Sequence, residues 1–133
     1  MKIGLLLVTV FFLSCDNNEN TDPLYGKWVI YKKVETRTDS DQVTVIEKII
    51  SPTNQECNYS CYMKIKKNSL MTYYINLEGS YTSEITNENP KEHLDYRIEK
   101  GALILSSILY PNNTTLLVET YYKKYDGELP PEN

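Results

Sequence analysis

Short runs of alternating apolar and polar residues recur along this 133-residue chain. The clearest is residues 93–99, where Leu94, Tyr96 and Ile98 alternate with polar neighbours. A period of two is typical of a half-buried β-strand. The other runs are rich in β-branched and aromatic residues, with turn formers between them. The pattern predicts eight strands, at residues 26–33, 42–50, 62–66, 70–77, 81–86, 93–99, 102–110 and 114–125.

The connections between these strands are mostly short, as in the predicted tight turn at Lys100-Gly101. Short turns favour antiparallel pairing, and eight antiparallel strands can lose their free edges by closing into a barrel. We therefore expect an all-β, antiparallel eight-stranded barrel; the alternative is an open antiparallel sheet or a small sandwich. Residues 23–133, about 110 in number, suit a single domain, and residues 126–133 should leave the sheet as an extended tail.

The first residues form a leader. Lys2 is followed by an apolar run at residues 3–13, which is the size of a signal-peptide core. It is shorter than the ~20 residues that cross a bilayer. The run stops at Cys15, and residues 16–22, all polar, predict a solvated tether.

The string Phe12-Leu13-Ser14-Cys15 resembles the lipobox of bacterial lipoproteins. The resemblance implies that residues 1–14 are removed, and that Cys15 receives a diacylglycerol on its thiol and an acyl chain such as palmitate on its amino group. Two or three chains anchor a protein firmly to a membrane. The alternative is an ordinary cleaved signal followed by a structural cysteine.

The acidic residues after Cys15 resemble an export signal of Bacteroidetes lipoproteins. This implies a lipid-anchored protein of the bacterial cell envelope, on the outer membrane and exposed at its surface. In enteric-type bacteria, Asp16 would instead suggest retention at the inner membrane.

Lipidation of Cys15 would leave Cys57 and Cys61 as a pair in an oxidising compartment, spaced C-N-Y-S-C. The simplest interpretation is a disulfide that closes a small loop. A zinc site would need more ligands, and His93 is the one histidine. A redox pair would need C-x-x-C at the start of a helix. We expect no metal site.

Charge and motifs exclude several classes of function. Removing Lys2 from the 14 basic residues leaves 13 against 18 acidic ones, a net charge of −5. Nucleic-acid binding, which needs a basic face, is therefore not expected. The sequence contains no hydrolase, metalloprotease or phosphate-loop motif, so we expect neither an enzyme nor a cofactor. Glu47 and Glu119 interrupt apolar strands; as a pair they could act as acid and base of a glycosidase, but outward-facing or ion-paired carboxylates are favoured.

Two further strings point to a family. The motif G-x-W, formed by Gly26 and Trp28 in the first predicted strand, resembles the opening of lipocalin and calycin barrels. The end of the chain, ETYYKKYDGELPPE, is similar to the close of lipocalin-like domains in Bacteroidetes lipoproteins. The resemblance implies that Gly26 permits a close approach of the chain and that Trp28 plugs one end of the barrel. In lipocalins a basic side chain near the last strand packs over this tryptophan; Lys123 and Lys124 lie in that region, without a firm assignment.

The chain contains twelve tyrosines, including the adjacent pairs at residues 73–74 and 121–122. Neighbours in a strand face opposite ways, so one member of each pair should line the interior. Tyrosine combines apolar area with a polar tip, which suits either a ligand pocket or a half-filled core. The candidate ligand-binding residues are Tyr31, Tyr73, Tyr96 and Tyr121.

The function expected from these observations is non-catalytic binding of a small amphipathic or sugar-like ligand by a lipid-anchored, lipocalin-like barrel. The alternative is a protein-interaction or inhibitor module, an accessory subunit of an envelope complex. Its partner would contact residues 102–110, which are apolar on both faces, or the Cys57–Cys61 loop.

Overall fold

The computed structural model describes residues 22–52, 60–76 and 79–130. The leader, Cys15 and Cys57 lie outside these residues. The fold is all-β, with eight antiparallel strands and two short 3-10 helices, η1 and η2. Their bounds are β1 Gly26–Asp39, β2 Gln42–Ile49, β3 Ser60–Lys66, β4 Ser69–Asn76, β5 Gly79–Thr86, η1 Pro90–Glu92, β6 Tyr96–Glu99, β7 Ala102–Leu109, η2 Pro111–Asn113 and β8 Thr115–Lys124.

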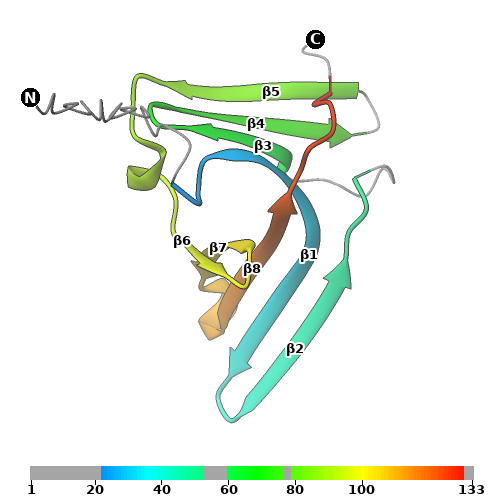
Figure 1. Ribbon diagram of the computed structural model, residues 1–133. Helices are drawn as coiled ribbons and strands as arrows, with labels where there is room; N and C mark the ends of the chain where they lie inside the picture. The colour runs from blue at the N-terminus through cyan, green and yellow to red at the C-terminus, as the bar shows by residue number, and fades with distance from the viewer. Residues whose placement is uncertain (1–21, 53–59, 77–78, 131–133) are drawn as a thin grey trace, which may run out of the picture.

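The long, bent strand β1 joins the two halves of the sheet (Figure 1). One of its edges pairs first with β3, from Gly26 to Val29, and then with β2, from Lys32 to Asp39. Its other edge pairs with β8, and the register shifts at Tyr31, between Ile30 and Lys32. Such a bulge bends a strand and increases its twist. The bend places β3, β4 and β5 in one layer and β6, β7 and β8 in another (Figure 1).

The sheet is open. The strand order is β5-β4-β3-β1-β8-β7-β6, with β2 as a side branch on β1, so β5 and β6 form the two ends. In the part of the chain that the structure describes, no pairing joins these ends. The antiparallel eight-stranded sheet is therefore confirmed, whereas closure into a barrel is not; the observed topology is that of the alternative, an open antiparallel sheet.

The strand boundaries agree with the predicted ones to within two residues except at two places. β1 continues to Asp39 instead of ending at residue 33, because its polar second half pairs with β2 and β8. β6 begins at Tyr96 rather than at residue 93, because η1 precedes it and His93 is the C-cap of that helix. The predicted turn at Lys100-Gly101 is confirmed: both residues have positive φ, as a two-residue hairpin requires.

The hydrophobic core lies between the two layers. Its largest fully buried side chains include Trp28, Ile30, Met63, Leu103 and Tyr122, from four different strands. Their neighbours in the strands face the other side of the sheet, where Val29 and Ile104 are also buried. Burying a large apolar side chain contributes about 1.5–3 kcal/mol, and this shared core holds the open sheet in its curved shape.

The second half of β1 and all of β2 form an arm that extends away from this core (Figure 1). Every residue of β2 is exposed, including Val43, Val45, Ile46 and Ile49. Among the described residues, β2 pairs with β1 alone, and its other edge has no partner strand there.

Candidate functional site

A cavity of about 240 Å³ lies between the two layers. It is lined on one side by residues of β3, β4 and β5, and on the other by Leu94 and Leu105. It therefore occupies the position that corresponds to the interior of a barrel. The residues of the first side are Met63, Leu70, Thr72, Tyr74, Ser83 and Ile85.

Strand alternation and register bring these side chains together. Met63, Thr72 and Ser83 lie opposite one another in a row across β3, β4 and β5. Leu70 and Ile85 form part of the adjacent row, two residues further along on the same face. Because the side-chain period of a strand is two, both rows face the core.

The lining combines apolar groups with a few hydroxyls. Five side chains are apolar, and Thr72, Tyr74 and Ser83 add hydroxyl groups. The Thr72 hydroxyl lies 3.3 Å from the Ser83 carbonyl oxygen, to which it donates. Small-molecule sites are typically apolar with a few polar groups that fix orientation, at volumes from about 300 Å³ upward. The lining of the cavity has this character, but its volume of about 240 Å³ lies below that range, so it has room for a small ligand only.

One end of the core is closed by Trp28. Its indole nitrogen donates a 2.8 Å hydrogen bond to the carbonyl oxygen of Leu24, and both side chains are almost fully buried. The amino group of Lys124 lies 4.1 Å from the centre of the Trp28 ring and donates a 2.6 Å hydrogen bond to the Tyr25 carbonyl oxygen. Burial lowers the pKa of Lys124, and Asp22 opposes this more weakly.

Gly26 lies beside the amino group of Lys124. Its φ of +129° is one that side chains with a Cβ rarely adopt, and a Cβ there would lie 3.1 Å from the Lys124 amino group. The glycine therefore leaves room for the lysine to reach across β1 to Trp28. Of the two lysines in this region, Lys123 and Lys124, the one whose amino group lies over the Trp28 ring is Lys124.

The turn before β1 is held by an ion pair. The Asp22 carboxylate accepts a 3.0 Å hydrogen bond from the Leu24 backbone nitrogen and lies 2.5 Å from the Lys91 amino group. The hydrogen bond from Lys91 lowers the pKa of Asp22, and the same bond raises the pKa of Lys91. Since Lys91 belongs to η1, this pair joins the start of β1 to the connection that precedes β6.

The four tyrosines predicted to bind a ligand are placed differently from one another. Tyr96 lies opposite Leu105, on the cavity side, and packs against the core. Tyr73 is buried but lies on the face of β4 opposite to Tyr74. Among the described residues that line the cavity there is one tyrosine, Tyr74, which sequence reasoning did not select. Leu70 and Thr72, at alternate positions of the same strand, share its face.

Tyr31 and Tyr121 contact each other edge to face, with ring centres 6.2 Å apart, and the Lys32 amino group lies 4.2 Å from the Tyr121 ring. Tyr121 is adjacent to the core residue Tyr122, so it faces the other side of β8. These two tyrosines therefore form a contact outside the cavity. Their role in binding a ligand stays a prediction.

Cys61 is fully buried and disulfide-bonded. Its partner lies outside the described residues, so the pairing with Cys57 stays a prediction. Lipidation of Cys15 likewise falls outside the part of the chain that the structure describes.

Glu47 and Glu119 lie on one face, each opposite Val34 from its two neighbouring strands. The Glu119 carboxylate is 2.5 Å from the Arg97 guanidinium, and this bond is the main reason why the pKa of Arg97 is raised. Glu47 is exposed. His93 is also exposed and lies 2.5 Å from the Glu88 carboxylate.

Comparison with family models, with characterised proteins and with solved structures found no match to this chain. Within the described residues, no helix has the length and apolar character needed to cross a membrane. In the same residues, no three His, Cys, Asp or Glu side chains form a group that could hold a metal ion.

Proposed function

We propose that this chain is a lipid-anchored lipoprotein of the bacterial outer membrane that binds a small amphipathic or sugar-like ligand and does not transform it. In this proposal the curved sheet is a lipocalin-like barrel that is open between β5 and β6. Cys15 carries the lipid, and residues 16–22 form the tether. The observation that carries the proposal is the 240 Å³ cavity between the layers, with its apolar walls and three hydroxyl-bearing side chains.

The position of Trp28 supports the lipocalin-like part of the proposal. Gly26, Trp28 and Lys124 lie together at the start of β1. The cavity lies on the same side of the sheet, because Met63 and Leu70 belong both to its lining and to the core cluster that contains Trp28. A ligand in the cavity would therefore stabilise the folded state, since it binds the folded chain and not the unfolded one.

The test is thermal unfolding of the full chain in detergent, followed by circular dichroism, with 1-octanol and methyl glucoside as probes. At least one probe should raise the midpoint of the wild-type protein. Ser83→Phe places a ring into the cavity from the exposed edge strand β5 and should abolish the shift. Thr82→Phe is the matched control, because Thr82 faces the other side of β5.

A wild-type midpoint that neither probe raises would contradict binding in the cavity. An equal loss of the shift in Ser83→Phe and Thr82→Phe would contradict it as well.

A protein-interaction module is the second candidate, and the apolar arm favours it. Val45, Ile49 and Ile108 are 61%, 70% and 53% exposed. Val45 and Ile108 lie in one row with Thr36 and Leu117, across β2, β1, β8 and β7. Exposed apolar groups gathered on one face are typical of interaction sites.

The corresponding experiment is isolation of the acylated protein from membranes after cross-linking. If this candidate is correct, a partner is recovered with the wild-type protein and lost with Val45→Lys. The control, Thr44→Lys, places the same charge on the opposite face of β2 and should retain the partner. Failure of the wild-type protein to recover any partner would exclude this candidate.

A further inference from the structure

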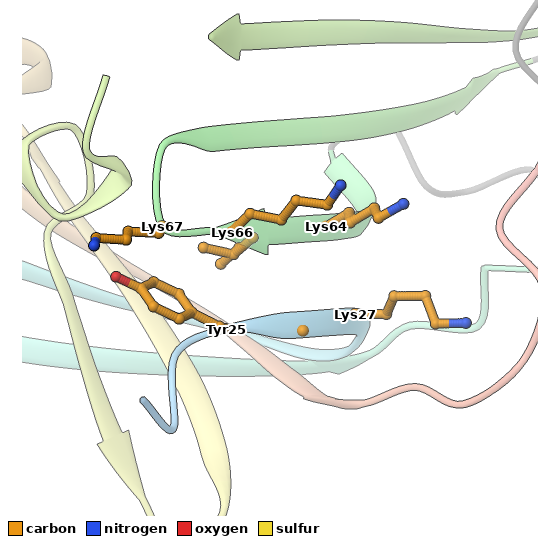
Figure 2. A pocket seen from close by; sticks show the side chains of 7 residues that line it. Tyr25, Lys27, Lys64, Lys66 and Lys67 are labelled. Atoms are coloured by element: carbon orange, nitrogen blue, oxygen red, sulfur yellow. The ribbon is translucent and has the colours of Figure 1, made fainter. Parts of the chain in front are cut away.

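Four lysines line a second pocket, of about 470 Å³, where β1 pairs with β3 (Figure 2); Tyr25, Gly26 and Ile65 complete its lining. Lys27 comes from β1, Lys64 and Lys66 from β3, and Lys67 from the turn that follows β3. In each strand these lysines alternate with residues of the core, so they face away from it. The chain as a whole carries a net charge of −4, so this pocket concentrates charge of the opposite sign.

Two of these lysines are direct cross-strand partners. Lys27 lies opposite Lys64 in the pairing of β1 with β3. Side chains at such positions have Cβ atoms about 4.5–5.5 Å apart, and like charges there repel each other. Lys66 is on the same face of β3, and Figure 2 shows the side chains of Lys27, Lys64 and Lys66 extending in the same direction. An anion held among their amino groups would replace this repulsion with attraction.

The positive charge of the pocket is not neutralised by the described part of the chain. None of the four lysines forms an ion pair with a described carboxylate. The Lys27 amino group donates a 2.5 Å hydrogen bond to the Gly127 carbonyl oxygen and lies 5.8 Å from the Tyr125 ring, both neutral partners. In the row that contains Lys64, the nearest acidic position is Glu84, and Met71 lies between them.

The other end of the pocket is formed by Tyr25 and Lys67 (Figure 2). The Tyr25 hydroxyl forms no hydrogen bond with the residues that the structure describes, so it is available as a donor. A ligand that spans the pocket would therefore meet a ring with a free hydroxyl at one end and a group of amino groups at the other. A cleft lined by charges of one sign also raises the local concentration of oppositely charged ligands.

We infer that this pocket binds a phosphate group. The lysine ammonium is a compact point charge that binds phosphate through its charge, whereas planar, bidentate recognition of either carboxylate or phosphate favours arginine. The chain has two arginines, Arg37 and Arg97, and neither lines the pocket. A doubly charged phosphate also compensates two opposed ammonium groups better than a singly charged carboxylate. The inference does not depend on whether the interior cavity binds a ligand.

The experiment is isothermal titration of the full chain in a nonionic detergent with inorganic phosphate, and with acetate as the carboxylate comparison. Phosphate should bind measurably and acetate at least tenfold more weakly. The double variant Lys27→Gln with Lys64→Gln should lower the affinity for phosphate at least tenfold. Because binding is electrostatic, raising the salt concentration should also weaken it.

The matched control is the double variant Lys100→Gln with Lys123→Gln. It removes the same charge at two exposed positions outside the pocket and should retain the wild-type affinity. Thermal unfolding without phosphate shows whether each variant folds. The Lys27/Lys64 variant should still unfold cooperatively, because the loss of the Lys27 hydrogen bond is offset by removal of a repulsion.

The phosphate could belong to a soluble ester or to a lipid headgroup. Titration with dihexanoyl phosphatidic acid, and with dihexanoyl phosphatidylcholine as its neutral counterpart, distinguishes these sources. Phosphatidic acid binding at least tenfold more tightly than inorganic phosphate identifies a headgroup, and equal affinities identify a free phosphate; both results support the site. The inference is overturned if neither ligand binds, if acetate binds as tightly as phosphate, or if both double variants lose the same affinity.

Discussion

The amino group of Lys124 lies over the ring of Trp28, 4.1 Å from its centre, and joins the last strand to the first. The same amino group donates to the Tyr25 carbonyl oxygen, and Gly26 leaves the space that it needs. One lysine thus fixes the residues just before Trp28 as well as the Trp28 side chain itself.

Replacing Lys124 with Met should lower the free energy of unfolding by about 1–2 kcal/mol, through loss of the cation–π contact and of one hydrogen bond. Lys124→Arg should retain most of that stability. Urea denaturation followed by Trp28 fluorescence measures the effect. Lys123→Met is the control, because the Lys123 side chain points to the opposite face of β8. An equal decrease in the free energy of unfolding in both Met variants would show that the contact with Trp28 does not stabilise the fold.

The ion pair between Asp22 and Lys91 predicts a pH dependence. The pKa of Asp22 is lowered from 3.8 and that of Lys91 is raised from 10.5 by their hydrogen bond. The pair therefore stabilises the fold fully between these ordinary pKa values, and the stabilisation is lost as pH falls through the lowered pKa of Asp22. Asp22→Asn should lower the thermal midpoint at pH 6, and the difference from wild type should shrink towards pH 2. A difference that stays constant over this range would contradict the assignment.

The disulfide of Cys61 should connect it to Cys57. Mass spectrometry of peptides from the non-reduced protein should recover these two cysteines in one linked species. Because a short loop gains little from closure, reduction should cost about 2 kcal/mol or less of unfolding free energy. A peptide in which Cys61 is linked to Cys15 would instead exclude lipidation of Cys15 in those molecules.

Glu119 and Glu47 should respond differently to the same substitution. Glu119 is 15% exposed and bound to Arg97, so Glu119→Gln removes a charged hydrogen bond that is partly shielded from water. It should lower the thermal midpoint, whereas Glu47→Gln, at an exposed position in the same row, should leave the midpoint unchanged. Equal midpoints for the two variants would show that the contact with Arg97 adds no stability.

Much of this fold follows from local pattern. The alternation in residues such as Tyr96 and Ile98 located the strands, and the Lys100-Gly101 pair located a tight turn, because both signals depend on neighbouring residues alone. The second half of β1 was missed since its polar side chains need no core; pairing with β2 and β8 keeps it extended. The openness of the sheet depends on how far β1 bends at Tyr31, which no local pattern encodes.

The sequence predicted that tyrosines face the interior of the sheet, but it did not predict which tyrosine lines the cavity. Adjacent tyrosines guarantee that one of them faces inward, but the choice between Tyr73 and Tyr74 depends on the register with β3. The sequence pattern did not predict the lysine pocket either. Lys27 and Lys64 are far apart in the chain, and only the pairing of β1 with β3 places them opposite each other.

Binding of a small amphipathic molecule between the layers of the sheet can be observed by NMR of the methyl-labelled full chain in perdeuterated detergent with added 1-octanol. If the proposal is correct, intermolecular nuclear Overhauser effects connect the octanol chain to the methyl groups of Leu70, Ile85 and Leu105. Effects confined to the exposed methyl groups of Val45 and Ile49, with none at the cavity residues, would contradict it.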